Sequence, residues 1–186
     1  TSAYGGTPLS QLTGLQYSTY VQQSSSDSLA PYLQLRVDRD ANGTTDDVLF
    51  FEPAYQNGTY GTTTYGVTAI PNQCGGNPNC VTEDVWQTWD ASLGGWWSST
   101  DSAGGPPLFT LADYAAEYPD ARLSTDVPSF RVQSGGGAPT WDNFIGNIDA
   151  VMIAGTTFDF EPSATSTPTT SPMVKVTINK FIDGQM

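Results

Sequence analysis

The segment between residues 38 and 46 carries oxygen-bearing side chains at alternate positions, between two apolar runs. A tightly wrapped loop can aim such alternating oxygens at one point, and Gly43 would supply the sharp turn that this needs. Hard oxygen ligands in a flexible ring suit Ca²⁺ better than Mg²⁺ or zinc. The segment predicts a calcium site, with a solvated turn as the alternative. The expected ligands are the side chains of Asp38, Asp40, Asn42 and Asp46 and the backbone carbonyl of Thr44.

This loop does not follow the EF-hand pattern, because position twelve, counted from Asp38, is Leu49 and not a bidentate glutamate. Apolar, strand-like runs also flank it on both sides. It resembles the D-x-D-x-D-G-x-x-D loops on β-hairpins of extracellular proteins, including integrin propeller blades. No neighbouring group is poised to use the ion as a Lewis acid, so the expected role of calcium is structural.

The two cysteines, Cys74 and Cys80, lie in the sequence CGGNPNC. The glycines and the proline between them favour a tight loop that brings the two sulfur atoms together. Two cysteines at this spacing, in a chain without histidine, pair more often than they stay reduced. We therefore expect a disulfide, with two thiols as the alternative, and the disulfide implies an oxidising, extracellular setting.

Four tryptophans lie close together in the segment 86–97. The adjacent Trp96 and Trp97 would point to opposite faces of a strand. One of them could pack in the core while the other is exposed as a flat platform for a sugar ring, as in carbohydrate-binding modules. The alternative is that all four tryptophans pack in or over the core.

Several carboxylates are candidates for glycoside hydrolysis, which needs two such groups across a cleft. None of them forms a recognisable catalytic motif. Two lie in Glu-Pro pairs that close apolar segments, and we interpret both as strand ends. The candidate carboxylates are Asp47, Glu52, Glu83, Asp84, Asp159 and Glu161.

The amino-acid composition excludes several classes of binding partner and of catalytic site. The chain of 186 residues has 19 acidic residues, 6 basic residues and no histidine, which gives a formal net charge of -13. Nucleic acid and anionic membrane surfaces attract basic clusters, so neither is an expected partner, and no run is long enough to insert into a membrane. The absence of histidine excludes Ser-His-Asp and Cys-His catalysis and histidine-ligated zinc.

Strand-like segments separated by turns recur along the chain and predict an all-β fold. One helix is expected over residues 110–119, where Thr110 would cap the N-terminus, Asp113 would complete a capping box and Pro119 would end the helix. The expected strands cover residues 12–21, 31–37, 47–53, 59–70, 85–91, 129–135, 148–155 and 156–162.

The segment 141–155 resembles the closing strands of concanavalin A-like sandwiches, including laminin G-like domains. It matches their pattern F-x-G-x-I-D-x-V-x-I from Phe144 to Ile153. Together with upstream segments, it looks like a module of secreted bacterial surface proteins. The resemblance implies an antiparallel β-sandwich of the jelly-roll type and says little about a ligand.

The chain changes composition at residues 163–173, a stretch rich in Ser, Thr and Pro that is typical of linkers. Beyond it, Val174, Val176 and Ile178 alternate with polar residues, as in a strand, and the tail resembles the opening strand of a prealbumin-like adhesin repeat. A lone strand cannot bury its apolar face. We expect it to enter a sheet of the same subunit or of the next one, and the second case yields a polymer. A loose tail is the alternative. The expected division is a sandwich module at 1–162, a linker at 163–173 and a strand at 174–186.

These observations leave three functions open. The leading hypothesis is a non-catalytic extracellular or cell-surface module, stabilised by calcium and a disulfide, that assembles with itself or acts in adhesion. The first alternative is a carbohydrate-binding module that uses an exposed tryptophan. The second alternative is a polysaccharide-active enzyme. Calcium is the expected cofactor in the leading hypothesis.

Overall fold

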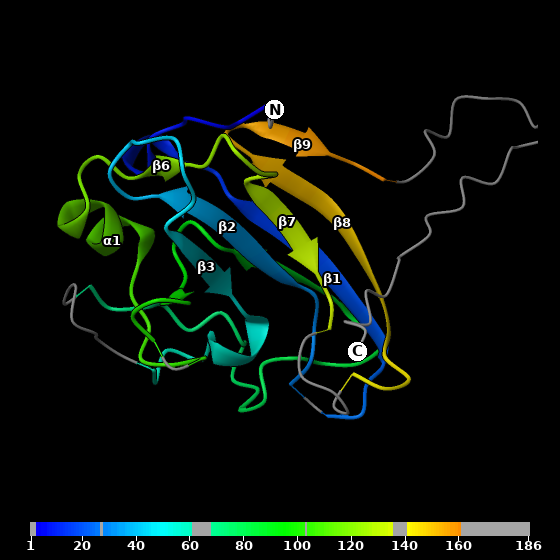
Figure 1. Cartoon of the computed structure of the whole chain (residues 1–186). Helices are drawn as coiled ribbons and strands as arrows, with labels where there is room; N and C mark the ends of the chain where they lie inside the picture. The colour runs from blue at the N-terminus through cyan, green and yellow to red at the C-terminus, as the bar shows by residue number, and fades with distance from the viewer. Residues whose placement is uncertain (1–2, 27, 61–67, 103, 136–140, 161–186) are drawn as a thin grey trace, which may run out of the picture.

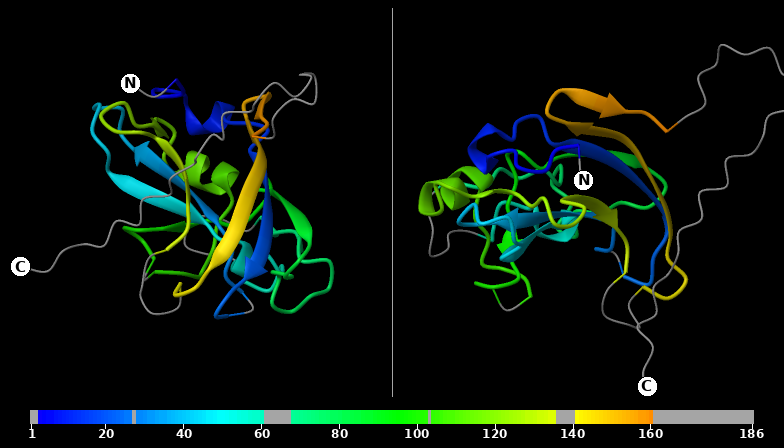
Figure 2. Two further views of the ribbon diagram at one scale, coloured as in Figure 1. Left: turned by 90° about the vertical axis from the view of Figure 1, so that its right-hand side faces the viewer. Right: turned by 45° about the horizontal axis from the view of Figure 1, so that its top comes forward.

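The computed structural model describes residues 3–26, 28–60, 68–102, 104–135 and 141–160. In this part of the chain, the strands form two antiparallel sheets, with one short α-helix at one end of them (Figure 1). Figure 2 shows the two sheets facing one another. This arrangement confirms the expected all-β sandwich with a short helix. The expected linker and C-terminal strand lie outside the described residues.

The first sheet has the strand order β4-β1-β8-β9. The pairing of β1 with β8 contains an irregularity, because β8 uses one more residue than β1 between two paired positions. Ala150, with a φ of 49°, lies in this bulge. The strands are β1 (Gln16–Gln23), β4 (Trp86–Asp90), β8 (Ile145–Ile153) and β9 (Thr156–Phe158).

The second sheet has the order β5-β3-β2-β6, and β7 also pairs with β2. β2 and β3 form a hairpin, and this hairpin carries the aspartate-rich loop. The strands are β2 (Tyr32–Asp38), β3 (Asp47–Phe51), β5 (Trp97–Ser98), β6 (Arg122–Leu123) and β7 (Phe130–Gln133).

The core lies between the two sheets and is filled by alternate residues of their inner faces. Tyr17 of β1 contacts Phe51 of β3 edge-on, with 6.1 Å between the ring centroids. The indole N–H of the buried Trp89 donates to the hydroxyl of Thr19 at 2.9 Å, which satisfies both polar groups inside the core. The large inward-facing side chains therefore join the two sheets into one core.

The helix α1 (Leu111–Glu117) begins as the sequence predicts. The Asp113 N–H donates to the Thr110 side chain, and the Asp113 carboxylate accepts from the Thr110 N–H, which makes the expected capping box. Leu111 and Tyr114 are buried against the core. The helix thus has a fixed start and a fixed inner face, and it holds the Tyr114 hydroxyl at one end of the sandwich.

Some of the expected strand boundaries were wrong. β1 starts at Gln16 and not at residue 12, because Gly14 turns the chain with a φ of 60°. Residues 68–70 form no strand, and residues 61–67 of the same expected strand lie outside the described residues. The strands β5 and β6 have two residues each, which is too short for a recognisable sequence pattern. They are strands because they pair with β3 and β2.

Candidate metal site

The segment with alternating oxygens is the connection between β2 and β3. The two strands pair as far as Val37↔Asp47, and the Asp46 N–H donates to the Val37 carbonyl at 2.8 Å. Asp38 is the last residue of β2, and Asp46 immediately precedes β3. Closure of the hairpin therefore brings the carboxylates at the two ends of the loop close together.

The structure brings together the three carboxylates among the predicted ligands. One carboxylate oxygen from each of Asp38, Asp40 and Asp46 lies within 4.8 Å of the others. Asp38 is buried, whereas Asp40 and Asp46 are exposed. The Asn42 side-chain oxygen accepts a hydrogen bond from the Thr44 N–H at 2.8 Å, which leaves it a second lone pair.

The loop is folded around the carboxylate of Asp38. One oxygen of Asp38 accepts from the Gly43 N–H at 2.8 Å, and the other accepts from the Asn42 N–H at 3.1 Å. Gly43 has a φ of 91°, which glycine adopts far more readily than other residues. Its predicted role as the turn residue is confirmed.

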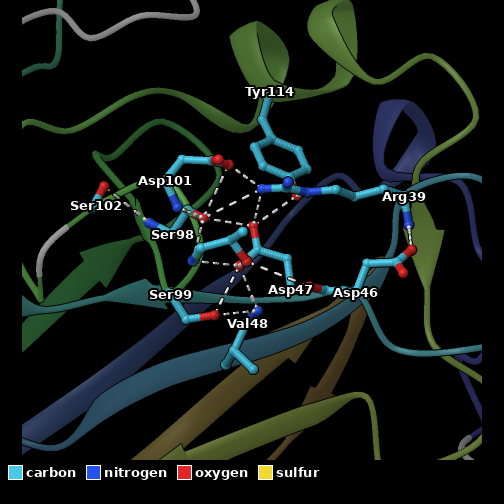
Figure 3. Close-up of polar contacts among 10 residues, drawn as sticks. Arg39, Asp46, Asp47, Val48, Ser98, Ser99, Asp101, Ser102 and Tyr114 are labelled. Carbon is cyan, nitrogen blue, oxygen red and sulfur yellow. Dashed lines mark hydrogen bonds and ion pairs between the residues drawn. The ribbon is translucent and has the colours of Figure 1, made fainter.

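Arg39 lies between two predicted ligands in the sequence, but its guanidinium points away to a separate network (Figure 3). It forms an ion pair with Asp47 at 2.6 Å and a second ion pair with Asp101. Its guanidinium carbon also lies 4.4 Å from the ring centroid of Tyr118. Within the described residues, no ion pair neutralises the three loop carboxylates.

Asp47, the first residue of β3, is the centre of this network (Figure 3). Its carboxylate accepts from the hydroxyls of Ser98 at 2.6 Å, Ser99 at 2.9 Å and Tyr114 at 2.9 Å. Burial alone would raise the pKa of this carboxyl, but the Ser98 hydrogen bond and the charge of Arg39 outweigh burial and lower it. The network ties the base of the loop to α1 and to the β5 region.

Asp126 holds the loop from another side. Its two carboxylate oxygens accept from the Thr45 hydroxyl at 2.7 Å and from the Thr45 N–H at 3.2 Å, and these hydrogen bonds lower the pKa of Asp126. Sequence reasoning missed Asp126, because it is 81 residues from Thr45 and follows no metal-ligand spacing. Sequence reasoning also missed Asp101, because it is distant from Arg39 in the sequence and the two residues meet only in the folded chain.

The donor set around the loop suits a hard cation. Calcium takes about six to eight oxygen ligands, and the three carboxylates, the Asn42 amide oxygen and the Thr44 carbonyl all belong to one turn. The set contains no nitrogen or sulfur donor of the kind that zinc prefers. These residues could hold Ca²⁺, and nearby waters would complete the coordination shell.

The disulfide between Cys74 and Cys80 is confirmed, with 4.4 Å between the two Cα atoms. Both cysteines are buried, and both belong to the main hydrophobic core. The bond therefore anchors the 74–80 loop to the inside of the sandwich. Spacing predicted the pairing but not the burial.

The structure places the two tryptophans of the predicted glycan platform in different environments. Trp96 is fully buried and donates its indole N–H to the Ala91 carbonyl at 2.8 Å, so it cannot stack on a sugar. Trp97 is half-buried and lies flat against Phe50, with 3.9 Å between ring centroids and 4° between ring planes. The exposed tryptophan of this segment is Trp86, which is 48 % exposed.

Glu52 is the one carboxylate among the described residues that line a cavity of about 120 Å³ beside Tyr55 and Trp141. Burial raises the pKa of Glu52, and a 3.0 Å hydrogen bond from the Trp97 indole N–H partly opposes this. A glycoside hydrolase would need a second carboxylate across the cavity. Within the described residues, the cavity therefore offers one carboxylate and not the pair that the enzyme hypothesis requires.

The other candidate carboxylates among the described residues do not line this cavity. Glu83 accepts from the Ser24 N–H at 2.8 Å, and Asp84 accepts from the Tyr20 hydroxyl at 3.1 Å. These contacts fix the segment before β4 against β1. Asp159 follows β9, and Glu161 lies outside the described residues.

Comparisons with protein-family models, with curated proteins and with solved structures found no match to this chain. The resemblance to concanavalin A-like and prealbumin-like modules therefore remains a prediction. Among the described residues, no helix has the length and apolar character needed to span a membrane.

Proposed function

We propose that this chain is a non-catalytic extracellular surface module, in which Ca²⁺ bound by residues 38–46 stabilises a β-sandwich that serves in assembly or adhesion. The observation that carries the proposal is the convergence of the Asp38, Asp40 and Asp46 carboxylates within 4.8 Å. The proposed ligands are these three side chains, the Asn42 side chain and the Thr44 carbonyl.

Electrostatics supports a cation at this position. Three carboxylates at such short distances repel one another. Arg39, the nearest basic residue in the sequence, is held by Asp47 and Asp101. The net charge of -13 adds to the repulsion. A divalent cation would relieve this repulsion, and modules outside cells commonly bind calcium with a Kd of about 0.1–1 mM.

The disulfide supports an extracellular location. Disulfides persist in oxidising compartments and are rare in the cytosol, where thiols are kept reduced. Cys74 and Cys80 are bonded and buried in the core, which suits a protein that folds and works outside the cell.

The edge strand β9 supports a role in assembly. Within the described residues β9 pairs only with β8, and all of its residues are exposed. Phe158 lies opposite Val151 and therefore on the same, inner face of the sheet, yet it is 40 % exposed while Val151 is 4 % exposed. A strand added at this edge would cover Phe158 and pair the open backbone groups.

We infer that the predicted C-terminal strand takes this place beside β9. Its alternating apolar residues would face the same side as Phe158 and extend the inner face of the sheet. The strand comes from the same subunit or from a neighbouring one, and only the second arrangement links subunits into a chain. The apolar residues concerned are Val174, Val176 and Ile178.

Thermal unfolding with and without calcium tests the metal proposal. Chelator-treated protein should gain thermal stability when millimolar CaCl₂ is added, because a ligand that binds only the folded state adds about 1.4 kcal/mol at a tenfold excess over Kd. Asp40→Asn should abolish most of this gain. The matched control is Asp120→Asn, an exposed aspartate outside the loop, and it should keep the gain. An equal calcium response in both variants would contradict the proposal.

A further inference from the structure

The outer face of the sheet formed by β4, β1 and β8 presents its side chains in rows that run across the strands. The register places Trp86 opposite Tyr20, and Tyr20 opposite Asn147. Residues directly opposite each other point to the same side of a sheet. Because Tyr17, Thr19 and Trp89 of these strands are buried on the inner side, the alternate residues form a solvent-facing surface.

The first row is aromatic. The centroids of the Trp86 and Tyr20 rings lie 5.6 Å apart and the ring planes are tilted by 48°, so together they form a bent apolar platform. The Tyr20 hydroxyl donates to Asp84 at 3.1 Å, which fixes the orientation of its ring. Trp86 is 48 % exposed, and much of its surface is therefore available for a ligand.

The next rows are polar on β1 and β4 and lie about 7 Å apart along the strands, since each strand residue rises about 3.4 Å. The hydroxyls of Ser18 and Thr88 are 2.9 Å apart, and this row continues to Asp149 on β8. Beyond it, the Gln16 amide donates to Asp90 at 3.0 Å. Hydroxyl, amide and carboxylate groups thus follow the aromatic platform along one surface.

The charge of this surface selects among ligands. Asp84, Asp90 and Asp149 contribute carboxylates, and the strands β1, β4 and β8 contain no lysine or arginine. An acidic polymer would be repelled by this surface and by the net charge of -13. A neutral ligand with many hydroxyl groups could donate hydrogen bonds to the second carboxylate oxygens of Asp84 and Asp149, whose first oxygens accept from the Tyr20 hydroxyl and from backbone N–H groups.

From these observations we infer a second binding site, for a neutral polysaccharide, on the outer face of β4, β1 and β8. One sugar ring would stack on Trp86 and Tyr20, because the C–H groups of a sugar face are attracted to aromatic rings. The following sugar units would meet the row of Ser18 and Thr88. This site is separate from the calcium loop and involves neither of the tryptophans that the sequence suggested.

Cross-strand aromatic and hydroxyl pairs also stabilise sheets, and a purely structural role for them predicts a different outcome. If the pairs serve stability alone, Trp86→Ala lowers the melting temperature, and its migration through every polysaccharide gel matches that of the unmodified chain. If the surface binds glycan, the same substitution removes binding while the variant is still folded. Binding and melting temperature must therefore be measured on the same samples.

Affinity electrophoresis of the whole chain through gels that contain single soluble polysaccharides provides the test. The neutral probes are hydroxyethylcellulose, xylan, galactomannan, laminarin and glycogen, and the acidic probe is polygalacturonate. We expect retardation by at least one neutral probe and none by polygalacturonate. Trp86→Ala and Tyr20→Ala should each weaken binding about tenfold or more, and Trp86→Phe should retain part of it.

Two controls separate this site from other effects. Leu93→Ala removes another exposed apolar side chain, 59 % exposed and outside the three strands, and should leave retardation unchanged. Asp40→Asn changes a proposed calcium ligand and should bind the polysaccharide normally as long as it is folded. The polysaccharide result therefore does not depend on whether the calcium proposal is correct. Lack of retardation by every neutral probe, binding of polygalacturonate alone, or unchanged binding by Trp86→Ala would each overturn the inference.

Discussion

Asp47 follows the loop carboxylates directly in the sequence, but its role in the structure is different. Its side chain is fully buried and receives an ion pair from Arg39 and hydrogen bonds from Ser98 and Tyr114. Removal of one partner of a buried ion pair leaves the other charge uncompensated, which commonly costs about 3–5 kcal/mol. Because Arg39 keeps its contact with Asp101, we expect Asp47→Asn to lower the free energy of unfolding by about 3 kcal/mol.

Asp101→Asn is the matched control for this substitution, and both variants would be measured by urea denaturation. The Asp101 side chain is 31 % exposed, so its ion pair with Arg39 is screened by water. We expect a loss of about 1 kcal/mol or less, as is usual for ion pairs near the surface. Equal losses in the two variants would show that Asp47 is not the centre of the network.

At the scale of elements, the β9 edge leads to a prediction about the tail. Deletion of residues 163–186 should lower the melting temperature, because Phe158 and the open backbone groups of β9 would lose their proposed cover. If the strand is donated between subunits, the full chain should also form concentration-dependent oligomers in light scattering, and the truncated chain should be monomeric. An unchanged melting temperature together with an unchanged mass would contradict strand donation.

The sequence identified the elements whose residues carry their own pattern. The alternation in residues 31–37 predicted β2, and the capping residues Thr110 and Asp113 predicted the start of α1. β5 was missed because its two residues pair with Leu49 and Phe50 only through the tertiary fold. Local patterns record local structure, whereas short strands depend on neighbours that are distant in the chain.

The candidate site also contains residues that the sequence predicted and residues that it did not. The carboxylates that converge lie within one hairpin, so their spacing was sufficient to predict them. The residues that support the loop come from distant segments: Ser98 is 51 residues from Asp47, and Tyr114 is 67 residues from it. The run of hydroxyl residues at 98–100, directly after a tryptophan pair, was the one visible signal of this network. Only an exposed tryptophan can contact a ligand. Which tryptophan is exposed depends on the packing of the folded chain, so the sequence alone could not show it.

At the scale of the whole molecule, the two proposed sites lie on different sheets. The calcium loop ends the β2–β3 hairpin of the second sheet, and the proposed glycan surface is the outer face of the first sheet. The core between the sheets separates the two sites, so substitutions at one should not alter binding at the other. Calcium would then act on stability, and the sheet surface on recognition.

Calcium binding itself tests the central claim most directly. Isothermal titration calorimetry on the chelator-treated full chain should show one saturable calcium site per chain. Asp38→Asn and Asp40→Asn should remove it, because both carboxylates belong to the group that converges within 4.8 Å. Asp120→Asn should bind calcium like the unmodified chain. The absence of saturable binding in the unmodified chain, or binding that survives both loop substitutions, would contradict a calcium site at residues 38–46.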